Sequence, residues 1–393
     1  MMNQLTPERK QVQKKKPISN HVKQIHESEF LSAVAMGKVI QQYLSPFQVQ
    51  DAALCERAKS IVLQMYNLPQ DMIYFPGCLP VSLMRKDIDC LEEMSYMVAE
   101  KTDGVRHLML IFKDAGTMYS MFVDRGFRFF FSSYKFSTQI TAGLGTLIDG
   151  EMILESTGFK FLVHDIICVG GNQGVASLSY QERMYHVQEL LRWHCFPPDN
   201  PRLDLVTILP KQVIPFSELP ILWENIIPNL KHRCDGLILT PDTLPHTGKK
   251  NKFLFKWKHP ADHTIDLQLE PPIVVPAENE WPVFQLMTWD TVHLHPFGEI
   301  AMSLQEWNNI GVMDPYGLLG SIVECRFDFD RALWVPITLR SDKVKPNDIT
   351  TIELTIKTMM ECLSISELMN ISRHVRKEKK FVTHHDPRQY YDP

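Results

Sequence analysis

Lys101 is the first residue whose surroundings suggest chemistry. It ends the apolar stretch SYMVAEK, and Asp103, Gly104 and Arg106 follow it in a short turn. A lysine amine attacks an electrophile only when it is uncharged, so its usual pKa of about 10.4 must be lowered by burial or neighbouring cations. The Lys-x-Asp-Gly pattern is weak by itself, because a surface turn with a solvated lysine has the same letters. Other segments must therefore support it.

Four further segments carry polar groups inside apolar stretches that are typical of strands. They are TLIDGEMI with Asp149 and Glu151, FLVHDIIC with His164 and Asp165, HRCDGLIL with Asp235, and FLFKWK with Lys256 and Lys258. An unpaired buried ion is costly, so repeated acids and lysines in such strands indicate one shared polar cleft. Lys256 and Lys258 alternate around Trp257 and should face one side, where they can contact phosphates and lower the pKa of Lys101.

The elements that position these residues follow from hydrophobic spacing. Helical spacing over residues 30–65 predicts two amphipathic helices, and short apolar runs between turns predict strands over residues 94–169. A helix is expected over residues 177–194, with further strands at 232–240 and 252–258. After Pro260 the alternation at residues 265–269 begins a second β domain, which PPIVVPAENEWP interrupts and which suits a small antiparallel barrel. Residues 350–380 have helical periodicity.

Composition limits the class of protein. The 393 residues suggest two or three domains, and the formal charge of −5 shows no general basicity, so any contact with nucleic acid must be local. Eight cysteines without a Cys-x-x-Cys pair favour a reducing compartment. Because no secretory signal or membrane span is visible, we expect a soluble intracellular protein. Residues 1–25 are predicted to be a flexible basic arm, either a solvated tail or a nuclear-import or RNA-contacting segment.

Three flanking segments extend the pattern around Lys101. FPGCLPVSLMRKDI precedes the lysine, VDRGF follows it, and LWVPITLRSDKVKPN lies near the end of the chain. Together with the central segments they resemble the covalent nucleotidyltransferase superfamily and, within it, the eukaryotic-type mRNA capping guanylyltransferases. The resemblance spans roughly residues 70–350. ATP-dependent ligases share the middle segments but usually lack the first and last.

The resemblance implies an α+β fold in two main parts. A nucleotidyltransferase domain with an antiparallel β core is expected over residues 26–262, and an OB-fold domain over residues 263–348. Residues 349–380 would form a C-terminal helical segment that packs back on the first domain, and residues 381–393 a tail.

The resemblance also implies the reaction. Lys101 would attack the α-phosphorus of GTP, release pyrophosphate and carry GMP, and a 5′-diphosphate RNA would then take the GMP as its cap. The predicted nucleotide-binding residues are Thr102, Arg106, Arg125, Glu151, His164, Asp235, Lys256, Lys258, Arg340, Asp342 and Lys343. Mg²⁺ or Mn²⁺ is the expected cofactor because phosphoryl transfer needs charge neutralisation, with Glu151 and Asp235 as the expected ligands.

Individual roles follow from the family. Arg106 and Glu151 would hold the ribose, and Arg125 the sugar and phosphate region. Arg340, Asp342 and Lys343 would bind pyrophosphate when the domains close. His164 departs from the family, which usually has Phe or Tyr stacked on guanine there; its imidazole either stacks or is a buried, hydrogen-bonded histidine.

Two other functions fit the same segments. One is an ATP-dependent RNA or DNA ligase, and the other is a non-catalytic RNA- or polymerase-binding protein with the same fold. No RNA triphosphatase or methyltransferase segment is visible, so these activities would belong to separate partners. A phosphorylated RNA polymerase II tail is a partner by analogy. The expected location is the nucleus, or the cytoplasm for a viral or parasite protein.

Overall fold

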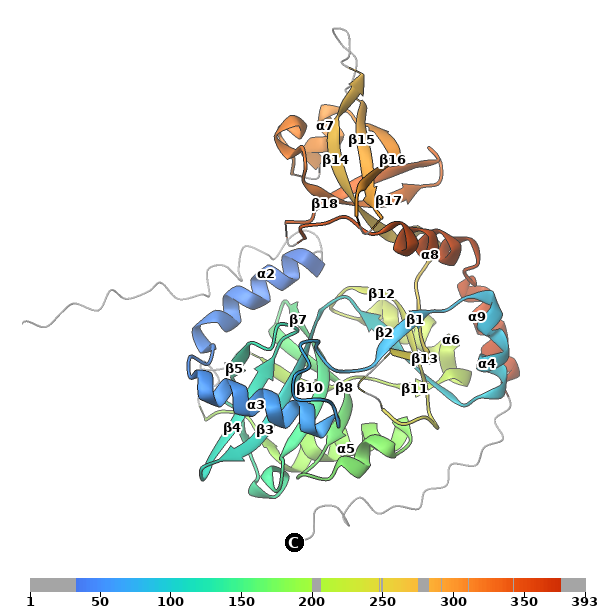
Figure 1. Cartoon of the computed structure of the whole chain (residues 1–393). Coiled ribbons are helices and arrows are strands. Elements are labelled where there is room, and N and C mark those ends of the chain that lie inside the picture. The colour runs from blue at the N-terminus through green and yellow to red at the C-terminus, as the bar shows by residue number, and fades with distance from the viewer. Residues whose placement is uncertain are drawn as a thin grey trace, which may run out of the picture.

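The computed structural model describes residues 33–199, 206–246, 248, 250–274, 283–290, 292–309, 311–341 and 343–375. The predicted basic arm and the C-terminal tail lie outside these residues. Figure 1 shows a larger body that contains two sheets, with a smaller β-rich body above it. None of the helices in these ranges combines the length and the apolar character that a membrane span needs.

The first sheet has six strands in the order β10-β8-β7-β3-β4-β5. Its strands are β3 (Val105–Asp114), β4 (Thr117–Val123), β5 (Phe129–Phe131), β7 (Thr146–Glu155), β8 (Gly158–Cys168) and β10 (Thr207–Pro210). All neighbours are antiparallel except β10 and β8. A separate two-stranded ladder joins β6 (Lys135–Phe136) and β9 (Cys195–Phe196).

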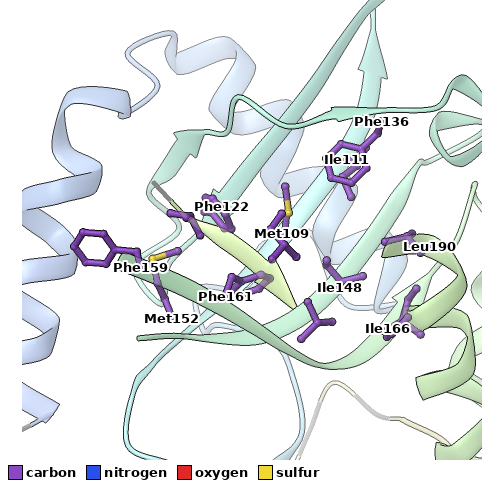
Figure 2. Close-up of a cluster of buried hydrophobic side chains, with 14 of the residues drawn as sticks. Met109, Ile111, Phe122, Phe136, Ile148, Met152, Phe159, Phe161, Ile166 and Leu190 are labelled. Carbon is purple, nitrogen blue, oxygen red and sulfur yellow. The ribbon is translucent and has the colours of Figure 1, made fainter. Parts of the chain in front are cut away.

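Helices cover both faces of this sheet because successive residues of its strands place apolar side chains on opposite faces. Met109 and Ile111 of β3 pack with α2 (Ala33–Leu44) and α5 (Tyr180–Trp193), a cluster drawn in part in Figure 2. Leu108 and Leu110 point the other way and pack with α3 (Ala52–Met65). Asp51 caps α3 by accepting a hydrogen bond from Leu54 N at 3.0 Å.

The second sheet has five strands in the order β1-β13-β12-β2-β11. Its strands are β1 (Leu79–Ser82), β2 (Tyr96–Thr102), β11 (Ile214–Pro215), β12 (Cys234–Pro241) and β13 (Lys250–Trp257). One apolar cluster joins this sheet to α4 (Ile88–Glu93), α6 (Leu219–Ile221) and α9 (Ile365–His374). Trp257 anchors α9 from β13, since its indole nitrogen donates to Leu363 O at 2.7 Å.

The third sheet forms the smaller body and is antiparallel throughout, in the order β16-β15-β14-β17-β18. Its strands are β14 (Thr264–Val274), β15 (Val283–Trp289), β16 (Leu294–Ala301), β17 (Ile322–Asp328) and β18 (Leu333–Leu339), and α7 (Leu304–Asn309) follows β16. The predicted α+β class with antiparallel sheets is thus confirmed. The OB-fold assignment and the domain limits stay predictions.

Two elements differ from the sequence-based expectation. Strand β14 continues through Pro271 and Pro272 to Val274, so the Pro-rich interruption begins later than predicted; the register shifts there accommodate the missing N–H donors. The last helical segment is two helices, α8 (Ile349–Met360) and α9, because Ser364 and Glu367 form a capping box that starts a new helix.

Candidate active site

Lys101 and Asp235 meet where β2 and β12 run side by side. Lys101 Nζ lies 2.6 Å from Asp235 Oδ1, and Lys258 Nζ lies 2.5 Å from Asp235 Oδ2. Gly236 lets β12 and β13 approach each other closely, since a Cβ at this position would lie 1.9 Å from Trp257 O. Its φ of +146° also favours glycine. All three charged side chains keep some exposure, between 11% and 25%. One carboxylate therefore holds two lysines that a substrate can still reach.

The charge state of Lys101 differs from the prediction. Burial lowers its pKa, but Asp235, through charge and hydrogen bond, raises it more, and Glu151 and Asp103 add to this effect. The net pKa is raised, so Lys101 is an ammonium here. The expected net lowering of this pKa is not found, because Lys101 pairs with the Asp235 carboxylate, which Lys258 shares.

A second charged group adjoins Thr102, the residue after the lysine. Lys211 Nζ donates to Thr102 Oγ1 at 2.6 Å and lies 3.3 Å from Glu100 Oε1. Thr102 Oγ1 in turn donates to Glu100 Oε1 at 2.6 Å. Lys211 and Glu100 were missed in the sequence, although both interrupt apolar stretches in the way that identified Asp235. The contact spans 109 residues, which local spacing does not predict.

His232 extends this group to the other sheet. Its Nε2 lies 3.3 Å from Glu100 Oε1 of β2, and its Nδ1 lies 2.9 Å from Glu155 Oε1 of β7. Burial lowers the pKa of His232, but hydrogen bonds and charges from the two glutamates raise it more. Only a doubly protonated imidazole donates to both carboxylates. His232 therefore joins the strand that carries Lys101 to the strand that carries Glu151.

Arg106 is held by three hydrogen bonds. Its Nε donates to Asp149 Oδ1 at 2.9 Å, its Nη2 pairs with Asp149 Oδ2, and its Nη1 donates to Cys78 O at 2.8 Å. Gly77 packs against the guanidinium, because a Cβ there would lie 2.3 Å from Nη2. The family segment FPGC therefore fixes Arg106, and Asp149 is a partner that sequence reasoning left without a role.

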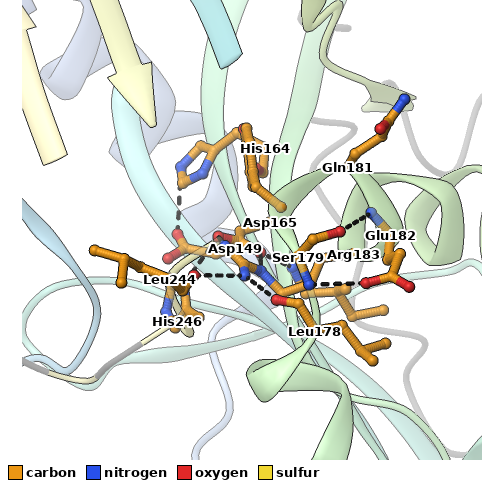
Figure 3. A network of polar contacts seen from close by, with 12 residues as sticks. Asp149, His164, Asp165, Leu178, Ser179, Gln181, Glu182, Arg183, Leu244 and His246 are labelled. Carbon is orange, nitrogen blue, oxygen red and sulfur yellow. Dashed lines mark hydrogen bonds and ion pairs between the residues drawn. The ribbon is translucent and has the colours of Figure 1, made fainter. Parts of the chain in front are cut away.

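Glu151 and His164 flank this pair. Glu151 lies opposite Arg106 in the ladder between β7 and β3, and burial raises its pKa despite Lys211 and Lys101. His164 Nε2 lies 3.4 Å from Asp149 Oδ1, as Figure 3 shows. Burial lowers the pKa of His164 to about 4, so its ring is neutral near pH 7. Its role as a guanine platform stays a prediction.

A separate ion cluster lies behind His164. Arg183 of α5 donates from Nε to Asp165 Oδ1 at 2.7 Å, and His246 Nδ1 lies 2.8 Å from Asp165 Oδ2 (Figure 3). Arg183 also donates to Leu178 O at 2.8 Å. All three charged side chains are buried. The Asp165 carboxylate thus ties β8 to α5 and to the loop before β13.

The structure does not bring Arg125 to the Arg106 group. Arg125 is in the turn after β4, where its charge lowers the pKa of His107. His107 and Asp124 line a cavity of about 250 Å³ beneath α2. His107 follows Arg106 in β3, and successive side chains of a strand point to opposite faces. Arg125 itself is exposed, and its predicted contact with the sugar and phosphate stays a prediction.

The remaining predicted residues are divided between two bodies. Lys256 is half-buried in β13 and lies on the same side of the strand as Lys258. Burial lowers the pKa of His263, and both lysines lower it further. Arg340 Nη1 lies 3.0 Å from Asp266 Oδ1 in the third sheet, and Lys343 also pairs with Asp266. These ion pairs lie within the smaller body, so Arg340 and Lys343 are not brought to Lys101. Asp342 lies outside the described residues.

The predicted metal ligands do not form a cage. Among the described residues no three His, Cys, Asp or Glu side chains are grouped to hold an ion. The donor set instead fits Mg²⁺ or Mn²⁺ bound mainly by nucleotide phosphates, which needs only one or two carboxylates. Glu151 is suited to be such a ligand. Burial raises its pKa by disfavouring the carboxylate form, and a bound cation would stabilise that negative charge. Asp235 fits only if one of its lysines moves away.

Known proteins match both bodies of the chain. Residues 45–260 match the family described as mRNA capping enzyme, catalytic domain, and residues 262–369 match mRNA capping enzyme, C-terminal domain. The mRNA-capping enzyme subunit alpha of Saccharomyces cerevisiae is 25% identical, over 84% of this chain and 86% of that protein. The Schizosaccharomyces pombe protein of the same name is 27% identical, over 75% and 79%. The mouse mRNA-capping enzyme is 28% identical, over 74% and 47%.

Among solved structures, the Chlorella virus DNA ligase-adenylate is 14% identical, with a TM-score of 0.29 over 68% of this chain and 100% of that one. This score is too low to relate the two molecules. The two family matches together cover more than half of the described sequence and include every segment that surrounds Lys101. The chain belongs to the mRNA capping enzyme family.

Proposed function

We propose that the chain is an mRNA guanylyltransferase in which Lys101 is the nucleophile. The observation that carries the assignment is the shared carboxylate of Asp235 in β12, which holds Lys101 of β2 at 2.6 Å and Lys258, directly after β13, at 2.5 Å. The amine attacks the α-phosphorus of GTP, a phosphorus–nitrogen bond forms, and the bond to the pyrophosphate oxygen breaks. Lys258 and Lys256 supply positive charge for the phosphates.

The attack requires that Lys101 first lose a proton. Asp235 Oδ1 is the acceptor within hydrogen-bond distance of Nζ. Lys258 shares the same carboxylate, so it stays beside the proton acceptor while the phosphates arrive. Binding of the triphosphate weakens the hold of Asp235 on Lys101, because phosphate oxygens compete for both lysines. The phosphates are themselves anionic and do not lower this pKa; the positive charge of Lys258 and Lys256 beside the amine favours transfer of its proton to Asp235.

The base and ribose lie in our proposal between β7, β8 and the start of β3. Arg106 and Glu151, which face each other across this ladder, hold the ribose, and the neutral ring of His164 lies beside the base. Thr102 lies next to Lys101 and is fixed by Lys211. Glu151, and Asp235 once one of its lysines moves away, would hold a divalent cation, Mg²⁺ or Mn²⁺, which would supply charge neutralisation for the phosphate oxygens.

The second half-reaction passes GMP to a 5′-diphosphate RNA. The terminal phosphate oxygen of the RNA attacks the phosphorus, the phosphorus–nitrogen bond breaks, and Lys101 regains its proton. In the first half-reaction, Arg340, Asp342 and Lys343 bind the departing pyrophosphate when the smaller body, the proposed OB-fold of residues 263–348, closes on the larger one. In this structure Asp266 pairs with Arg340 and Lys343, so closure must break these ion pairs.

The cellular setting follows from the family. The proposed partners are a separate RNA triphosphatase, a cap methyltransferase and the phosphorylated tail of RNA polymerase II, and the proposed place of action is the nucleus. An ATP-dependent ligase is the enzymatic alternative. Incubation with labelled GTP or ATP, a divalent cation and no RNA separates the two. We expect a GMP adduct; an AMP adduct on Lys101 would contradict the capping assignment.

A further inference from the structure

Lys38 of α2 joins the larger body to the segment that carries Arg340 and Lys343. Its Nζ donates to Ser341 Oγ at 2.8 Å, although the two residues are 303 positions apart in the sequence. Figure 1 shows α2 on the side of the larger body that faces the smaller body. Lys38 is exposed, and no acid pairs with it among the described residues. Its positive charge can therefore act on an anion that binds beside Ser341.

The helix that carries Lys38 also contacts the strand that follows the nucleophile. Gly37, the residue before Lys38, packs on β3, since a Cβ at this position would lie 3.8 Å from Val105 Cγ2. Val105 is the first residue of β3, and a short turn joins it to β2, which carries Lys101. Lys38 therefore lies at the end of β3 that is next to the nucleophile. The contact with Ser341 brings the Arg340 segment to the same end of the larger body.

The two cations of the smaller body are already matched by acids. Arg340 Nη1 lies 3.0 Å from Asp266 Oδ1 and 3.9 Å from Glu324 Oε2, and Lys343 pairs with the other oxygen of Asp266. Asp266 is buried, and its backbone N–H donates to Asn347 Oδ1 at 2.8 Å, so the acid is held in place. These two acids balance the charges of the two cations while the pairs persist. Pyrophosphate is strongly anionic, so a cation from outside this cluster would strengthen its binding.

We propose that Lys38 is a pyrophosphate-binding residue, which acts from the larger body while Arg340 and Lys343 act from the smaller one. The inference rests on the proposed function, because it adds a residue to the site for the same leaving group. When pyrophosphate binds, the Lys38 ammonium exchanges the Ser341 hydroxyl for a phosphate oxygen, which is a stronger acceptor because it is charged. Lys38 neither gives nor takes a proton in this step.

A purely structural role for the Lys38 bond makes a different prediction for Ser341. If the bond serves only to hold the two bodies together, Lys38→Ala and Ser341→Ala remove the same contact and have the same effect. If Lys38 binds pyrophosphate, Ser341→Ala leaves the amine in place and available to the anion. Comparison of the two variants therefore separates the two roles.

The first measurement is the affinity of the full chain for inorganic pyrophosphate, by titration calorimetry without nucleotide. We expect Lys38→Ala to bind about tenfold more weakly, as the loss of one charge-assisted contact does. Lys38→Arg should keep most of the affinity, because a guanidinium also donates to phosphate oxygens. Ser341→Ala and the surface control Lys113→Ala, at the far end of β3, should bind as the wild type does. Equal affinity in Lys38→Ala and the wild type, or equal losses in Lys38→Ala and Ser341→Ala, would overturn the assignment.

The second measurement is the reverse of the first half-reaction. An oxygen of added pyrophosphate attacks the phosphorus of the GMP adduct, the phosphorus–nitrogen bond breaks, and Lys101 regains its proton as GTP leaves. Lys38→Ala should need about tenfold more pyrophosphate for half the maximal rate, with the maximal rate unchanged. A lower maximal rate at an unchanged half-saturating concentration would contradict the binding role. A wild-type chain without any GMP adduct would refute the proposed function, and the calorimetric comparison would still decide the role of Lys38.

Discussion

Asp235 and Asp165 each bind two cationic side chains, yet their surroundings differ. Asp235 holds Lys101 and Lys258, which keep 22% and 25% of their side-chain surface exposed. Asp165 holds Arg183 and His246, whose side chains are only 2% and 3% exposed. A substrate can replace the partners of the first acid but not those of the second. The comparison separates an ion cluster that reacts from one that supports the fold.

The largest expected effect is at the exposed cluster. Lys101→Ala should abolish the GMP adduct, because it removes the amine that lies against Asp235 Oδ1. Lys258→Ala removes the second amine of the same acid and should slow adduct formation without abolishing it. Gel analysis with labelled GTP measures both, and thermal unfolding of each variant checks that the fold is kept. A full-strength adduct in Lys101→Ala would show that another residue carries GMP.

The pH dependence of the adduct tests the sign of the Asp235 effect. Asp235 raises the pKa of Lys101, so Asp235→Asn should lower it and move the rising limb of the rate profile to lower pH. The maximum rate should also fall, because the proton acceptor is lost. Single-turnover rates between pH 6 and 10 measure this shift. A limb that moves to higher pH would contradict the raised pKa.

At the buried cluster the expected loss is in stability. Arg183→Met leaves the Asp165 carboxylate without its main partner, which should cost about 3 to 5 kcal/mol of unfolding free energy. Chemical denaturation with urea measures it. The double variant Arg183→Met with Asp165→Asn should recover part of the loss, since the unpaired charge is removed. A loss of unfolding free energy below about 1 kcal/mol would mean that the ion pair of Asp165 stabilises the fold no more than an exposed ion pair does.

His232 lies between the two kinds of cluster, because it is buried but touches the strand of Lys101. His232→Gln can donate to only one of Glu100 and Glu155, so we expect the single-turnover rate to fall about 10- to 100-fold through misplacement of β2. The double variant with Glu155→Gln removes the repulsion and should restore part of the rate. The control His186→Gln changes a buried histidine of α5 that contacts neither glutamate. Equal rates in His232→Gln and the wild type would rule out this positioning role.

The smallest effect is expected at a surface pair. Arg57 Nε lies 2.9 Å from Asp114 Oδ2, but the arginine side chain is 49% exposed. Arg57→Ala should change the unfolding free energy by about 1 kcal/mol or less and leave the adduct unchanged. Urea denaturation and the labelled-GTP gel measure these two quantities. A larger change in the unfolding free energy or in the GMP adduct would mean that side-chain exposure does not determine how much an ion pair contributes.

Local patterns predicted much of this arrangement. Apolar strands interrupted by charge identified Lys101, Asp235 and Lys258, and the structure joins them in one ion cluster. The division of the C-terminal segment into two helices was missed, although Ser364 and Glu367 have the Ser-x-x-Glu spacing of a capping box.

Other parts depend on contacts between distant segments. Lys211 reaches Thr102 across 109 residues, and no spacing rule links them. The raised pKa of Lys101 depends on which acid lies nearest, and that follows from the pairing of distant strands. The sequence therefore predicts which residues are polar within strands, whereas tertiary packing decides their partners and charge.

The central claim is that the amine of Lys101 becomes bonded to GMP. The most direct measurement is peptide mass spectrometry of the wild-type chain after incubation with GTP and Mg²⁺, without RNA. The account predicts a single acid-labile GMP modification on the peptide that contains Lys101. A GMP modification on Lys256, Lys258 or Lys211, with Lys101 unmodified, would contradict it.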